Sequence, residues 1–109
     1  MSELTLFMLQ RLTAKMLALL VIVHLGSILY ATHGGLSAEE ILLRTRGSLV
    51  WGLFYGAFVV AAAVHAPIGL RNVAREWTRW RGRSLDWAAA LLGIAFLAMG
   101  LRAVWAVVA

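Results

Sequence analysis

The sequence predicts an all-α membrane protein in which residues 1–109 form a single domain of three transmembrane helices. Three observations support this class. The chain is 62% hydrophobic and only 14% charged, unlike an ordinary soluble domain. It contains three apolar runs, each long enough to cross a hydrocarbon core of about 30 Å as a helix. Its basic residues gather on alternate connections between these runs, as expected for spans of fixed orientation.

The first transmembrane helix is expected over about residues 12–32. Lys15 stands at the start of the apolar run and can extend its ammonium to the headgroups, whereas Tyr30 marks the far interface. His24 lies inside this run. After Gly34-Gly35, Ser37 and Glu40 have the spacing of a capping box, which predicts a short helix along the membrane surface.

The second helix is expected over about residues 48–76, and it is uncharged from Leu49 to Leu70. The third is expected over about residues 85–108. The connection between them, residues 71–86, carries five arginines among two tryptophans. Such a pattern can indicate nucleic-acid binding, but we set this aside because membrane spans flank the connection on both sides.

Orientation follows from the basic residues. The amino-terminal segment and the Arg-rich connection (residues 71–86) hold seven lysines and arginines, against three in the remaining connection and carboxyl end. The positive-inside rule therefore predicts a cytoplasmic amino terminus and Arg-rich connection, with the carboxyl terminus outside. This N-in/C-out topology would place the chain in a bacterial inner membrane.

Several kinds of chemistry are excluded by what the sequence lacks. With no cysteine it can form neither disulfides nor cysteine-ligated iron–sulfur clusters. No cluster of ligands suits zinc. No Ser-His-Asp set, Gly-rich phosphate loop or pair of carboxylates indicates hydrolysis or phosphoryl transfer, so no catalytic residue is predicted.

His65 is the residue around which a function can be argued. An ionisable side chain at membrane depth is costly unless something receives it, so it is by default a functional candidate. Its helical neighbours include Ala61, Ala62 and Gly69, which would let a flat, bulky group approach the backbone. Pro67 follows closely and favours a kink. The alternative is a histidine that only hydrogen-bonds to another helix.

The residues around His65 resemble a known family. His65-Ala-Pro-Ile-Gly69-Leu-Arg71, followed by Glu76-Trp77, is similar to the H-x-x-x-G-[ILM]-R…[DE]-[YWF] segment of the cytochrome b and membrane-anchor subunits of succinate dehydrogenase and fumarate reductase. The segment Gln10-Arg11-Leu12-Thr13 is similar to the H-R-x-S/T-G opening of the larger anchor. The chain departs from the family pattern at Asn72, where the larger anchor commonly has a second histidine.

This resemblance implies a non-catalytic subunit of a succinate:quinone oxidoreductase complex. It would bind haem b, tether the flavoprotein and iron–sulfur subunits, and pass electrons to ubiquinone or menaquinone beside a sister membrane anchor. His65 becomes an axial ligand of the haem iron. The candidates for the quinone or the haem propionates are Arg11, Thr13, Arg71, Glu76 and Trp77. His24 is a candidate ligand of a second haem, as in the relatives that carry two.

His24 and His65 are not expected to share one iron. From the expected helix ends, His65 lies about 9 Å and His24 about 16 Å from the inner surface, whereas two axial ligands lie at similar depth. The partner of His65 should then come from another chain. Two other functions stay open beside the haem-binding anchor: a haem-free structural anchor, and a small lipid-binding scaffold whose Arg-rich connection contacts anionic lipids.

Overall fold

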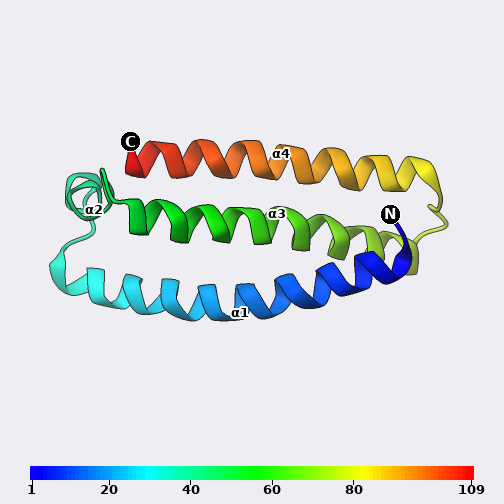
Figure 1. Ribbon diagram of the computed structural model, residues 1–109, viewed down its shortest axis with the longest axis horizontal. Coiled ribbons are helices and arrows are strands. Elements are labelled where there is room, and N and C mark those ends of the chain that lie inside the picture. Colours follow the sequence, from blue (N-terminus) through cyan, green and yellow to red (C-terminus); the bar gives the residue numbers. More distant parts are fainter.

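The computed structural model describes all 109 residues and is entirely helical (Figure 1). Its elements in chain order are α1 (Glu3–Gly34), α2 (Ala38–Thr45), α3 (Leu49–Trp77) and α4 (Arg83–Val108). Helices α1, α3 and α4 are each long and apolar enough to cross a membrane. The predicted all-helical class with three long apolar helices is therefore confirmed.

The three long helices lie side by side, with α3 between α1 and α4 (Figure 1). Each runs antiparallel to its neighbour, so the amino terminus and the α3–α4 connection lie at the same end of the molecule. The molecule measures 49 Å along the helices and 22 Å in each other direction. A bilayer with its headgroups is about 40–45 Å thick, so this length suits a single crossing by each helix.

Helix α1 begins at Glu3, earlier than the expected start near residue 12. The hydroxyl of Ser2 caps it by accepting a hydrogen bond from the backbone N–H of Thr5 at 3.1 Å. Glu3 is then in the first turn, where a negative charge complements the helix dipole. With 32 residues, α1 is about 48 Å long and must extend beyond a hydrocarbon core of about 30 Å.

Helix α2 starts with the capping box expected from the sequence. The Glu40 carboxylate accepts a hydrogen bond from the Ser37 backbone N–H at 2.9 Å, and the Glu40 N–H donates to the Ser37 hydroxyl at 3.2 Å. These bonds, together with the nearby charge of Arg44, lower the pKa of Glu40. Gly35 has a φ of 106°, and a Cβ there would collide with the Glu40 carboxylate. This turn therefore requires glycine.

The end of α2 and the turn that follows it are hydrogen-bonded to the end of α4. The buried hydroxyl of Thr45 donates to the carbonyl of Val107 at 2.6 Å, and the N–H of Gly47 donates to the carbonyl of Val108 at 2.7 Å. The last carbonyls of a helix have no partners within it, so these bonds satisfy groups that α4 itself cannot. They join the end of α2 and the turn before α3 to α4, at the end of the molecule opposite the amino terminus.

Small residues bring α3 and α4 together. Pro67 has no N–H, so the carbonyl of Ala63 one turn earlier loses its helical partner. Gly93 of α4 covers this carbonyl closely, because a Cβ on Gly93 would lie 3.1 Å from the Ala63 oxygen. Further along, a Cβ on Gly100 would lie 2.5 Å from a methyl group of Val59. The close approach of these helices thus depends on glycine in α4.

Candidate functional site

His65 contacts α1 through Thr13. The imidazole Nδ1 lies 3.2 Å from the hydroxyl of Thr13, a residue that is 5% exposed. Of the residues predicted for the site, these two are the pair that the fold joins by a direct hydrogen bond. The contact places His65 and Thr13 at the same level along the bundle.

The hydrogen bonds of Thr13 provide an assignment of the nitrogen of His65 that carries the proton. The single hydroxyl proton of Thr13 is directed to the carbonyl of Leu9 at 2.7 Å, with the carbonyl of Gln10 further away at 3.2 Å. We therefore assign the hydroxyl oxygen as the acceptor and the imidazole hydrogen to Nδ1. In a neutral imidazole the Nε2 lone pair is then free, and Nε2 makes no hydrogen bond within the chain.

The space beside the small residues near His65 is already partly filled by the protein itself. A Cβ on Gly69 would lie 3.3 Å from the side-chain nitrogen of Gln10, so α1 fills the space next to that glycine. Ala61 is 2% exposed and belongs to the core between the helices. The Gln10 side-chain oxygen is buried and has no hydrogen-bond partner. An unpaired buried acceptor is costly, which makes Gln10 a polar group that a donor on a ligand or partner chain could satisfy.

His24 lies in a different part of the bundle. Its ring packs edge-on against Tyr55 and Phe58, with centroid distances of 5.8 and 5.6 Å. Its Nδ1 is buried without a partner, and His24 lines a cavity of about 350 Å³ between all four helices. Because Thr13 is level with His65, His24 lies eleven residues, or about 16 Å, further along α1. The two imidazoles are therefore further apart along the bundle than the difference between the depths of about 9 and 16 Å expected from the sequence.

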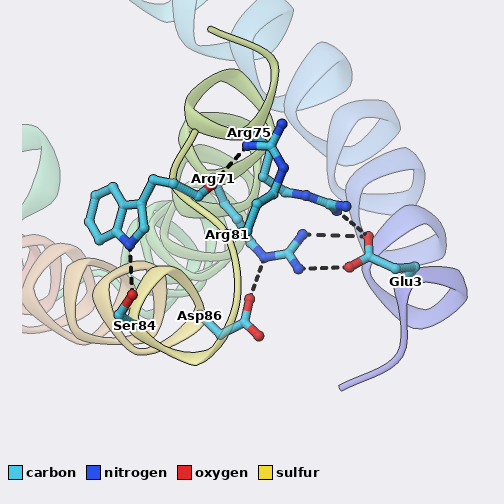
Figure 2. Close-up of polar contacts among 7 residues, drawn as sticks. Glu3, Arg71, Arg75, Arg81, Ser84 and Asp86 are labelled. Carbon is cyan, nitrogen blue, oxygen red and sulfur yellow. Dashed lines mark hydrogen bonds and ion pairs between the residues drawn. The ribbon is translucent and has the colours of Figure 1, made fainter. Parts of the chain in front are cut away.

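Arg71 is bound to both neighbouring helices (Figure 2). Its guanidinium pairs with Glu3 of α1 and with Asp86 of α4, each at 2.7 Å. Arg75 joins the same cluster through Glu3 at 2.9 Å. The Arg71 side chain is 8% exposed, whereas both carboxylates are more than half exposed. This arginine thus ties three helices together at one end of the bundle, and its donors are largely occupied.

The other predicted site residues are spread over the same end of the molecule. The guanidinium of Arg11 lies 5.6 Å from the centre of the Phe7 ring, a cation–π distance within its own helix. Glu76 is exposed and forms no ion pair, and Trp77 is 82% exposed. The fold does not gather these three around His65.

Sequence reasoning did not find Glu3 and Asp86 as the partners of Arg71. A signal was available, since the chain has only five acidic residues and three of them, Glu3, Glu76 and Asp86, lie at the predicted cytoplasmic end. No group of three or more His, Cys, Asp or Glu side chains could hold a metal ion. Any metal at His65 would thus need a ligand from a cofactor or another chain.

Comparison with known proteins gives no relative: no protein-family model, curated protein or solved structure matches this chain.

Proposed function

We propose that this protein is a haem b-binding membrane anchor of a succinate:quinone oxidoreductase-type complex, with His65 as an axial ligand of the iron. The observation that carries the proposal is the Thr13–His65 hydrogen bond. Histidines that bind metals usually donate their other ring N–H to an oxygen acceptor, which fixes the tautomer and strengthens the ligand. Thr13 provides that acceptor, and the Nε2 lone pair is left for the iron.

His65 would hold the group from one side only. His24 is about 16 Å along α1 from the level of His65, too far to bind the opposite side of the same iron. The second axial ligand would come from a sister anchor chain. When bound, haem b supplies one-electron transfer between an iron–sulfur subunit and quinone. The roles of this chain are to orient the imidazole through Thr13 and to keep its Nδ1 protonated.

The ionic cluster limits the roles of the other candidates. Because the guanidinium of Arg71 is paired with carboxylates on two sides, we assign it to joining the helices and not to a propionate or quinone. Arg11 and Trp77 stay candidates for those groups from the same end of the bundle. His24 would bind a second haem only if another chain supplied a facing ligand.

The proposed topology is N-in, with the amino terminus and the Arg-rich connection cytoplasmic and α2 along the outer membrane surface. The arginines concentrated at one end support this orientation in a bacterial inner membrane. The flavoprotein and iron–sulfur subunits would then dock at that end, and ubiquinone or menaquinone would be reduced beside it.

A reduced-minus-oxidised spectrum of the complex purified from its membrane tests the proposal. A b-type band should be present in the wild type, lost in His65→Ala and retained in His33→Ala, a control in the exposed last turn of α1. A complex without the band would favour the haem-free anchor, in which the Thr13–His65 bond serves helix packing alone. Retention of the full band by His65→Ala would reject His65 as the ligand.

A further inference from the structure

A polar groove lies at the end of α3, outside the helix contacts that surround His65. It has a volume of about 360 Å³ and is lined by Asn72, Arg75, Glu76 and Arg81, without any apolar side chain. The first three lie on one face of the last two turns of α3, and Arg81 reaches them from the connection to α4. The groove thus contains two positive charges, one negative charge and an amide.

Each of the two guanidiniums in the groove is oriented by hydrogen bonds that use only one of its own nitrogens, Nη1. Arg75 uses Nη1 to bind Glu3 at 2.9 Å. Arg81 uses Nη1 to donate to the carbonyls of Thr78 and Trp80, at 2.8 and 2.9 Å. An arginine has five N–H donors, so each keeps donors for a further acceptor. Because they are already oriented, the two side chains can bind an anionic oxygen with little further loss of conformational entropy.

Glu76 gives the groove its second kind of charge. Its carboxylate is exposed and forms neither a hydrogen bond nor an ion pair within the chain, unlike Glu3 and Asp86. Since Glu3 already neutralises part of the charge of Arg75, the remaining pattern is close to one positive and one negative site. A purely anionic ligand would meet repulsion from Glu76, whereas a zwitterion would match both charges.

The position of the groove indicates an amphiphile. It lies where α3 leaves its apolar run, beside Trp77 and Trp80, which are 82% and 45% exposed. Exposed tryptophans are typical of the membrane interface. About one turn deeper along α3, Val73 is exposed and apolar and lies about 60° around the helix from Glu76, so an acyl chain can continue along that side.

We propose that this groove binds the headgroup of a zwitterionic aminophospholipid of the phosphatidylethanolamine type. Arg75 and Arg81 donate to the phosphate, and Glu76 accepts from the primary ammonium. Phosphatidylcholine lacks N–H donors for Glu76, and no aromatic ring lines the groove to receive its quaternary ammonium. The site is independent of His65 and of the proposed haem.

Native mass spectrometry of the full chain released from lipid nanodiscs tests the site. The nanodiscs contain equal fractions of phosphatidylethanolamine, phosphatidylcholine and phosphatidylglycerol. The wild type should retain phosphatidylethanolamine about tenfold over phosphatidylcholine, the effect of one hydrogen bond to a charged group. Glu76→Gln should remove this preference, and Arg81→Gln should reduce retention of both lipids. Arg79→Gln is the matched control, because Arg79 makes no hydrogen bond or ion pair and does not line the groove.

Three results would overturn the proposal. Equal retention of phosphatidylethanolamine and phosphatidylcholine would mean that the ammonium is not recognised. Preferential retention of phosphatidylglycerol would assign the groove to attraction of anionic lipids in general. Displacement of the lipid by equimolar soluble glycerophosphoethanolamine would assign it to a water-soluble phosphate ester. Helix content measured by circular dichroism confirms that each variant is folded, and Arg75 is left unchanged because it also binds Glu3.

Discussion

The guanidinium of Arg71 and the carboxylate of Glu3 lie 2.7 Å apart, although 68 positions separate them in the sequence. On its other side the same guanidinium binds Asp86. A buried arginine must have its charge and donors satisfied, and here the helices on both sides of α3 each supply one carboxylate. The pairing therefore fixes how α1 and α4 meet α3 at this end.

Arg71→Gln should destabilise the bundle by about 2 kcal/mol, because hydrogen bonds to two charged partners are lost and not replaced. Reversible unfolding in bicelles measures the change. Asp86→Asn should cost less, since Arg71 keeps its contact with Glu3. Arg79→Gln, in an exposed side chain without partners, should have no effect. If Arg71→Gln is as stable as Arg79→Gln, the cluster does not hold the helices together.

Thr13→Val should weaken haem binding by about tenfold and raise the midpoint potential of the haem. The valine removes the acceptor of the His65 Nδ1–H, and such outer contacts typically contribute 10–100-fold in metal affinity. Haem titration and potentiometry measure both quantities. Thr13→Ser keeps the hydroxyl and should stay close to the wild type. Equal potentials in the valine and serine variants would show that Thr13 does not act on the ligand.

His24→Leu should leave the haem signal assigned to His65 unchanged and raise the stability of the bundle by about 1 kcal/mol. The buried Nδ1 of His24 has no partner, and removing an unsatisfied polar atom recovers part of its desolvation cost. Spectra and unfolding of the same preparation test both parts. Loss of half the haem would instead assign His24 to a second haem.

Gly100→Ala should destabilise α3–α4 packing by about 1–3 kcal/mol, the usual cost of overfilling a close contact. The new methyl group would meet Val59, a β-branched side chain that cannot easily turn away. Gly26→Ala is the matched control, since nothing lies within 4 Å of a Cβ there. That variant should be neutral or slightly stabilising, because alanine favours the helix. Equal stability of the two variants would contradict the observed packing.

The capping box of α2 should weaken in acid. Because the pKa of Glu40 is lowered by folding, its contribution is complete above the ordinary value of 4.5 and is lost as the pH falls through the lowered pKa. The Ser37 amide, which donates to this carboxylate, reports the change by NMR. Its shift should titrate with a midpoint below 4.5, and Glu40→Gln should abolish the step. A midpoint at or above 4.5 would contradict the pairing.

The long helices could be predicted because a membrane-spanning helix needs a long run of apolar residues, and such a run can be recognised in the sequence itself. The capping box of Ser37 and Glu40 could be predicted for a similar reason, since all its bonds are local. The start of α1 at Glu3 lies before the apolar run from which the transmembrane helix was predicted. Ser2 caps the helix there, and Glu3 is held by Arg71, a contact between residues far apart in the sequence.

The site was harder to predict. The depths assigned to His24 and His65 assumed a common starting level, whereas the Thr13–His65 contact sets the actual register between α1 and α3. That register depends on side-chain packing between helices, which periodicity does not specify. Likewise, the sequence marked Arg71 as a candidate site residue but could not identify Glu3 and Asp86 as its partners.

The positions of the hydrogen bonds and ion pairs between the helices imply an order in which the helices separate under force. Helices α3 and α4 are joined at one end by Arg71 and Asp86. At the other end, Thr45 of α2 and Gly47 just before α3 donate to the last carbonyls of α4. Beyond Thr13, no side-chain hydrogen bond connects α1 to another long helix. A force applied at the far end of α1 should therefore separate this helix from the others progressively, as far as Thr13, while α3 and α4 stay paired as a helical hairpin.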